Sequence, residues 1–266
     1  MTVILNPSAF YQENGFYVHP EAVLSPAEIA AAVHGLEQVR DGHYETGVPP
    51  EDSPWTPGDD PRKLVKIEMA QQCNRAIMAA VANPRLGELA ARITGASMIQ
   101  AWWVQLLIKP PAVPGGDFKT NVGWHQDGQY WDCWAPGSEV FTAWLALSDV
   151  TEAAGAMRFV PGSHQWSLLG QGDFYAQDLE GQIAVPAGKT WCEASGALPP
   201  GGVSFHHNLT LHASGPNTSG APRLSLAIHL RTENSSPKDG IPRGLAAFIE
   251  DRQRCPVLWD AGAHGG

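Results

Sequence analysis

Basic residues are scarce in this sequence, and they are not clustered. It holds 17 Lys and Arg against 27 Asp and Glu, which gives a formal net charge of −10. A protein that binds nucleic acid or an anionic membrane needs clustered Lys and Arg, because its affinity comes from contacts with phosphates. We therefore expect neither nucleic acid nor membrane as a partner.

Cysteines are few and long apolar runs are missing. Cys73, Cys133, Cys192 and Cys255 are far apart and form no Cys-x-x-Cys pair, which favours isolated thiols in a reducing compartment over a disulfide scaffold. No apolar run approaches the ~20 residues of a membrane helix, and the start of the chain lacks the basic and apolar regions of a signal peptide. We expect a cytoplasmic protein, and nothing in the sequence marks an oligomer interface.

Helices are predicted in the first third of the chain. Ser25-Pro26-Ala27-Glu28 matches a capping box with Pro at the first helical position, and the helix should end near Gly42. Gln71–Val81 and Pro84–Ile93 are two further predicted helices. Between the first two, Val48–Pro61 contains five prolines and should form a long loop.

Short strands are predicted after residue 96. Five segments are rich in aromatic and branched residues and are separated by Gly- and Pro-rich turns. They are Met98–Ile108, Phe141–Leu147, Ala156–Val160, Gly202–Leu211 and Arg223–Leu230. The pattern indicates a mainly β fold with flanking helices, in one domain over 1–266. Its parts would be a helical N-terminal part (about 1–96), a β core (about 97–232) and a C-terminal extension (about 233–266).

His125 and Asp127 are candidate metal ligands. In an extended segment, residues two apart point to the same side, so the imidazole and the carboxylate could meet at one metal ion. A third ligand could be His212, which ends the strand-like run Gly202–Leu211. Two His and one carboxylate leave open positions, as in non-haem Fe(II) oxygenases. Taken alone, a His-x-Asp pair is more often an ordinary pair at a strand edge.

Arg223 is a candidate anion-binding residue. Alternation along Arg223–Leu230 places it on the face opposite Leu224, Leu226 and Ile228. If those side chains face the helices, Arg223 faces the interior, where a guanidinium needs an anion. Its planar fork matches a carboxylate, such as the distal end of 2-oxoglutarate. A carboxylate of the protein is the alternative partner.

Several motifs together resemble the phytanoyl-CoA dioxygenase-like (PhyH) branch of the Fe(II)/2-oxoglutarate oxygenases. They follow in order over about half the chain: Leu107–Pro111, Trp124–Asp127, Ala143–Asp149, Gly155–His164, His212–Asn217 and Arg223. The resemblance implies a double-stranded β-helix (jelly roll, cupin-like), with Fe(II), 2-oxoglutarate and O₂ as cofactors. It also implies that 2-oxoglutarate is converted to succinate and CO₂ while a substrate C–H bond is oxidised.

By this resemblance Arg223 and Ser214 bind the 2-oxoglutarate carboxylate, and Gln105 and Trp144 line its pocket. Core packing is the alternative for Trp144. Lys109 also matches a family position, but we assign it no catalytic role. His164, His206, His207 and His229 are interpreted as turn residues or hydrogen-bonding neighbours, not as metal ligands.

The predicted substrate is a small metabolite or natural-product intermediate. Coenzyme A phosphates usually require Lys or Arg, so an acyl-CoA fits less well. Asp127 favours hydroxylation, because related halogenases have a small residue there; desaturation, ring closure and epimerisation stay open. Val48–Pro61 and Gln171–Ala197 could form a lid. Aromatic pocket walls or core packing could explain a set of six residues: Trp102, Trp103, Trp124, Tyr130, Trp131 and Trp134.

Two other classes of function remain. A cupin-like isomerase or hydrolase could use the same three ligands for another metal, but it would need no clamp for a 2-oxo acid. A jelly-roll binding module would hold no metal, and its His and Asp residues would only form hydrogen bonds.

Overall fold

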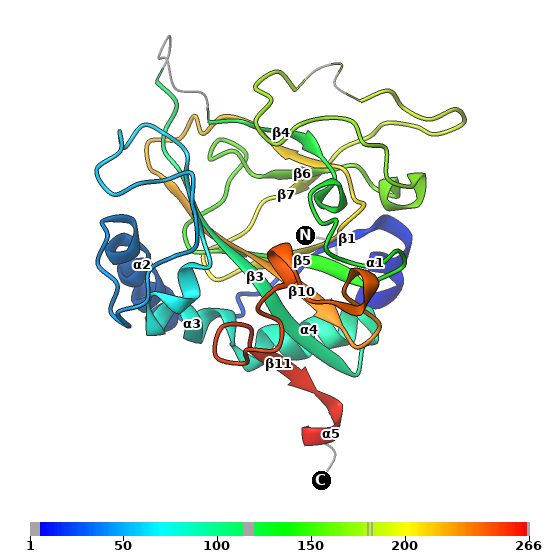
Figure 1. The fold of residues 1–266 in the computed structure, drawn as a ribbon. Helices are drawn as coiled ribbons and strands as arrows, with labels where there is room; N and C mark the ends of the chain where they lie inside the picture. Colours follow the sequence, from blue (N-terminus) through cyan, green and yellow to red (C-terminus); the bar gives the residue numbers. More distant parts are fainter. Residues whose placement is uncertain (1–5, 114–119, 180, 182, 265–266) are drawn as a thin grey trace.

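Two antiparallel β-sheets pack face to face in the computed structural model, which describes residues 6–113, 120–179, 181 and 183–264 (Figure 1). The large sheet has the order β1 (Phe16–Val18), β8 (Val203–His207), β5 (Val140–Ala146), β10 (Arg223–Thr232), β3 (Met98–Lys109) and β11 (Val257–Asp260), and β2 (Val65–Glu68) also pairs with β3. The small sheet has the order β4 (Val122–His125), β9 (His212–Ser214), β6 (Met157–Phe159) and β7 (Ala194–Gly196).

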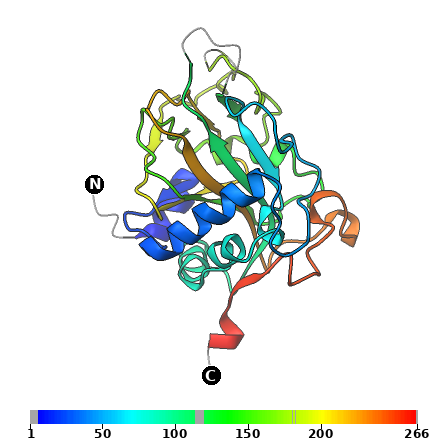
Figure 2. The ribbon, with the colours of Figure 1, turned by 90° about the vertical axis from the view of Figure 1, so that its left-hand side faces the viewer.

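Strict alternation in the strands of the large sheet separates an outer face from an inner one. In β10, Leu226 and Ile228 belong to the hydrophobic core between the large sheet and the helices. Arg223, Ser225 and Ala227 face the small sheet and are buried. The outer face is covered by α2 (Pro26–Arg40), α3 (Arg75–Val81) and α4 (Pro84–Thr94) (Figures 1 and 2). The polar groups of the site therefore lie between the sheets, as the alternation predicted for Arg223.

Helix starts follow their capping residues. The predicted capping box of Ser25 and Glu28 is present at the start of α2, and Gly42 follows its end with a φ of 84°. The prediction of one helix over Gln71–Val81 is wrong at its start. A short 3₁₀ turn, η1 (Ala70–Gln72), comes first, and the Asn74 side chain then caps α3.

The remaining elements are short. They are α1 (Pro7–Asn14), η2 (Asp127–Gln129), η3 (Ser163–Trp166), η4 (Lys238–Gly240), η5 (Gly244–Ala246) and α5 (Ala261–His264). None of the helices in the described ranges is long and apolar enough to cross a bilayer.

The predicted strand Gly202–Leu211 is divided between the two sheets. β8 ends at His207, where the Thr210 amide donates to the His207 carbonyl (2.9 Å) and closes a turn. The chain then crosses to the small sheet, so His212 begins β9 instead of ending the previous strand. This crossing brings His212 opposite His125 of β4.

The segment after residue 232 completes one edge of the large sheet. β11 pairs with the first residues of β3 and packs on α4. The close approach depends on Gly87 in α4, where a Cβ atom would lie 2.2 Å from the carbonyl oxygen of Leu258.

Candidate metal centre and cosubstrate pocket

His125, Asp127 and His212 converge between the sheets. His125 ends β4, Asp127 begins the 3₁₀ turn η2 two residues later, and His212 begins β9. The Nε2 atoms of both histidines lie 3.6 Å from Oδ1 of Asp127, and all three residues are buried. They are the one group of three or more His, Cys, Asp and Glu in the described part of the chain with ligand atoms within 4.8 Å of one another.

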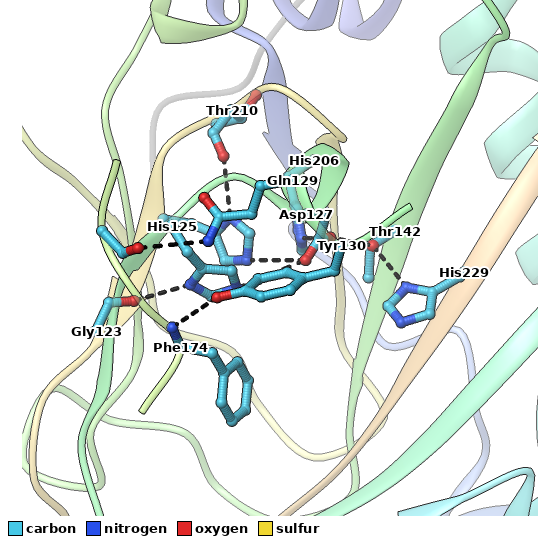
Figure 3. Close-up of polar contacts among 12 residues, drawn as sticks. Gly123, His125, Asp127, Gln129, Tyr130, Thr142, Phe174, His206, Thr210 and His229 are labelled. Carbon is cyan, nitrogen blue, oxygen red and sulfur yellow. Dashed lines mark hydrogen bonds and ion pairs between the residues drawn. The ribbon is translucent and has the colours of Figure 1, made fainter. Parts of the chain in front are cut away.

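Both imidazoles are oriented by backbone carbonyls. Nδ1 of His125 lies 2.8 Å from the Gly123 oxygen, and Nδ1 of His212 lies 2.9 Å from the Thr210 oxygen (Figure 3). Since a carbonyl can only accept, each Nδ1 carries the hydrogen and each Nε2 presents its lone pair to the centre. Two imidazoles and one carboxylate, without thiolate, fit Fe(II) with open positions.

The protonation states also suit a cation. Burial raises the pKa of Asp127, but the neighbouring rings of His212, His125 and His206 outweigh this and hold the pKa well below its usual value. Burial, together with His125 and His206, holds the pKa of His212 well below its usual value. The carboxylate is therefore ionised and the imidazole neutral, which are the forms that bind a metal.

A chain of hydrogen bonds supports Asp127 from behind. The Thr142 hydroxyl donates to Oδ2 of Asp127 (2.7 Å), and Nδ1 of His229 lies 2.9 Å from the same hydroxyl (Figure 3). Because the hydroxyl has one hydrogen, Nδ1 of His229 must be its donor. Burial lowers the pKa of His229 to about 4, so its ring is neutral. Nε2 of His206 also contacts Oδ2, at 3.2 Å.

Sequence reasoning missed Thr142. The feature that could have identified it is its position two residues before Trp144, which places both side chains on the inward face of β5. His206 and His229 are hydrogen-bonding neighbours of the site, as the sequence analysis proposed for them, and neither belongs to the group of three ligands.

One narrow pocket of about 40 Å³ brings all the predicted site residues together. It is lined by His125, Asp127, His212, Gln105, Trp144, Ser214 and Arg223, among others. Arg223 is 2% exposed, and its Nε has no partner in the described structure. Nη1 donates to the Gly155 carbonyl, and no carboxylate of the described residues pairs with the guanidinium. Burial lowers the pKa of Arg223 to about 9. The alternative of an ion pair with the protein is therefore not seen.

Lys109 holds the Ser214 hydroxyl in place. The buried ammonium donates to Oγ of Ser214 (2.6 Å) and to the Gly215 carbonyl (2.6 Å). The hydroxyl hydrogen of Ser214 is therefore left for another acceptor in the pocket. Burial, with Arg223 nearby, lowers the pKa of Lys109 well below its usual value.

A second cavity of about 250 Å³ lies on the other side of the ligands. It shares five residues with the pocket and continues past β2: Gln105, His125, Asp127, Phe174 and His229. We call it the outer chamber. Its other lining residues are Lys66, Glu68, Trp103, Tyr130, Trp131, Tyr175 and Leu245.

The six aromatic residues identified in the sequence do not all line the outer chamber. Trp103, Tyr130 and Trp131 line it, whereas Trp102 and Trp134 pack in the core beside it and Trp124 belongs to a different cluster.

The lid interpretation is only half supported. Phe174 and Tyr175 bring the segment Gln171–Ala197 to the chamber, but no residue of Val48–Pro61 lines either cavity. That loop lies behind β2 because the Ser53 hydroxyl accepts from the Glu68 amide (2.9 Å) and fixes it there. A lid function for this loop stays a prediction.

Known proteins share this sequence and fold. The family model described as Phytanoyl-CoA dioxygenase (PhyH) matches residues 11–225. A probable alpha-ketoglutarate-dependent hypophosphite dioxygenase of Stutzerimonas stutzeri is 26% identical, over 85% of this chain and 78% of the relative. The ectoine dioxygenase of Bordetella parapertussis is 27% identical, over 87% of this chain and 77% of the relative.

Solved structures confirm the predicted fold. The crystal structure of the non-heme alpha ketoglutarate dependent carbocyclase SnoK, from nogalamycin biosynthesis, superposes with a TM-score of 0.70 at 22% identity and covers 96% of each chain. Its likeness supports the jelly-roll arrangement of the two sheets. Together with the family match over most of the sequence, it shows that the chain belongs to the phytanoyl-CoA dioxygenase (PhyH) family of Fe(II)- and 2-oxoglutarate-dependent oxygenases.

Proposed function

We propose that this enzyme hydroxylates a small organic molecule, with Fe(II) held by His125, Asp127 and His212 and with 2-oxoglutarate as cosubstrate. The observation that carries the proposal is the shared pocket, in which an unpaired buried guanidinium, Arg223, lies beside a ready set of metal ligands. A cupin-like isomerase or hydrolase would have no use for this clamp. A metal-free binding module would not need three ligand atoms that converge on one point.

The residues of the pocket divide the work. Arg223 would grip the distal carboxylate of 2-oxoglutarate through its free N–H groups, and the Ser214 hydroxyl would donate to the same carboxylate. Gln105 and Trp144 would line the pocket beside it. Since 40 Å³ offers room for roughly three water molecules, the cosubstrate must move side chains apart as it enters.

Bound iron, with 2-oxoglutarate and O₂, supplies the oxidising chemistry: one oxygen atom enters the substrate as a hydroxyl group, and the other enters succinate as CO₂ is lost. The protein supplies position and keeps water out of the pocket. The Asp127 carboxylate occupies a ligand position and so favours hydroxylation over halogenation. Two relatives are named for the small molecules hypophosphite and ectoine, which supports a small substrate.

A cytoplasmic location is part of the same proposal. All four cysteines are free, and three of them are buried, as expected in a reducing compartment. Charge composition supports a small-molecule substrate in preference to a nucleic acid or a membrane surface.

An anaerobic titration of the Fe(II)-loaded protein with 2-oxoglutarate tests the proposal. We expect a visible metal-to-ligand charge-transfer band that saturates with the cosubstrate and disappears in Asp127→Ala. Bound Fe(II) without such a band would instead support the isomerase or hydrolase, and failure to bind Fe(II) would support the binding module.

A further inference from the structure

Lys66 and Glu68 form an ion pair in the wall of the outer chamber. Nζ of Lys66 lies 3.2 Å from Oε1 of Glu68, and the two side chains are 16% and 11% exposed. Glu68 also accepts from Nε1 of Trp103 (2.6 Å) and from Nε2 of Gln105 (3.3 Å). Since the two charges cancel, Lys66 and Glu68 together offer little attraction to a ligand with a net charge.

Hydrogen-bonding capacity remains on several groups of the chamber. Nδ1 of His229 donates to Thr142, so Nε2 of this neutral ring is an acceptor, and His229 lines the chamber. Lys66 has three N–H groups and makes one ion pair, so it can donate further hydrogen bonds. Its Nζ lies over the Phe174 ring, 4.7 Å from the ring centroid. The Tyr130 hydroxyl accepts from the Phe174 amide (2.9 Å), which leaves its hydrogen to donate. The outer chamber therefore presents both hydrogen-bond donors, on Lys66 and Tyr130, and an acceptor, on His229.

Aromatic faces form the rest of the wall. The rings are Trp103, Tyr130, Trp131, Phe174 and Tyr175. Flat rings of this kind pack well against the C–H face of a saturated ring. With about 250 Å³, the chamber has room for roughly twenty water molecules, which corresponds to a molecule of one or two rings.

From these features we infer that the substrate is a small, uncharged molecule with a hydroxylated ring. A hydroxyl group both donates and accepts, so its O–H can bond to His229 while its oxygen accepts from Lys66. The ring face packs on the aromatic wall, and the neutral ion pair needs no counter-charge. The cationic group of a zwitterion would need Glu68, whose carboxylate is already bound by Lys66, Trp103 and Gln105. The inference rests on the proposed function and narrows its substrate.

The test is anaerobic calorimetry on protein loaded with Fe(II) and 2-oxoglutarate. The probes are cyclic polyols (myo-inositol, methyl glucoside and cis-1,2-cyclohexanediol), zwitterions (proline and glycine betaine) and hexanoyl-CoA. We expect binding of at least one polyol and a shift of the charge-transfer band. Binding of a zwitterion or of the acyl-CoA alone, or of no probe, would overturn the inference while the band itself keeps the proposed function. Loss of the band would remove both.

Variants locate the binding groups. Lys66→Met should weaken polyol binding at least tenfold while the charge-transfer band persists. His229→Asn should also weaken polyol binding at least tenfold, measured at saturating Fe(II), since Asn keeps a donor near Nδ1 and removes Nε2. His229→Gln, which places an amide near Nε2, should recover part of the affinity. Lys238→Met and His34→Asn, at exposed positions outside both cavities, are the matched controls. Unchanged polyol affinity in Lys66→Met and His229→Asn would also contradict the inference.

Discussion

The guanidinium carbon of Arg223 lies 5.0 Å from the centre of the Trp144 ring, and both side chains are 2% exposed. The two residues are on adjacent strands, β10 and β5. A buried cation without a carboxylate partner is costly, and the electron-rich face of the indole offsets part of that cost. Trp144 therefore does more than pack in the core: its ring stabilises the Arg223 guanidinium, and it leaves the positive charge unneutralised.

Replacing this cation should weaken cosubstrate binding. Arg223→Lys keeps the charge but loses the planar fork, so we expect the 2-oxoglutarate concentration for half-saturation to rise at least tenfold. The charge-transfer band measures it directly. Arg85→Lys on α4, with a side chain 53% exposed, is the control. An unchanged half-saturation in Arg223→Lys would mean that the cosubstrate carboxylate binds elsewhere.

The support behind Asp127 predicts a metal phenotype. Thr142→Val removes the hydroxyl that donates to Oδ2 at nearly constant volume. We expect Fe(II) affinity to fall roughly 10- to 100-fold, since such supporting bonds orient the ligand. Anaerobic titration with Fe(II) measures the change, and Thr190→Val, at an exposed position, should behave as the parent. Equal affinities in all three proteins would show that Asp127 needs no such support.

The contact between α4 and β11 predicts a stability phenotype. Gly87→Ala would place a Cβ atom 2.2 Å from the Leu258 carbonyl, which belongs to the backbone and cannot rotate away. We expect a loss of about 1–3 kcal/mol in the free energy of unfolding. Chemical denaturation measures it, with Gly220→Ala as control because a Cβ there has open space. A stable Gly87→Ala variant would mean that the C-terminal segment moves aside freely.

His207 predicts a pH dependence of stability. Burial, with His164 and His206 nearby, lowers its pKa from 6.5 to about 4, and Nδ1 accepts a hydrogen bond from the Leu209 amide. The unfolded chain then binds a proton that the folded chain does not. Stability is full above pH 6.5 and falls as the pH drops toward 4, by up to about 1.4 kcal/mol per pH unit for one group. His207→Asn keeps an acceptor and should flatten the slope in urea unfolding between pH 7 and 4.5. A slope as steep as that of the parent would assign the proton uptake to other groups.

Much of the sheet architecture could be predicted from the sequence because alternation has a direct physical cause. A side chain in a two-sided strand must face either the helices or the other sheet, and the order Arg223, Leu224, Ser225, Leu226 shows which faces which. Such patterns fail in short elements. α1 has one fully buried side chain, Tyr11, so it carries no apolar stripe that a sequence could show.

Parts of the site could not be predicted, since they depend on how distant segments meet. His125 and His212 are 87 residues apart, and only the crossing after His207 places them opposite each other. Thr142 has no distinguishing context in sequence, because a threonine in a strand is commonplace and its partner Asp127 lies on another segment. The four residues of β2 were missed for the same reason: they follow a proline-rich loop and gain their strand from pairing with β3.

The position of β2 bears on how enzymes of this kind can diversify. Lys66 and Glu68 line the outer chamber from a short strand of the N-terminal part. The candidate metal ligands come from two strands of the small sheet and the turn η2, and Arg223 comes from β10 of the large sheet. If the outer chamber holds the substrate, mutations in β2 can alter which compound is accepted without replacing a candidate metal ligand or Arg223. Selection could therefore adapt such an enzyme to new metabolites through a peripheral strand that carries none of the candidate metal ligands.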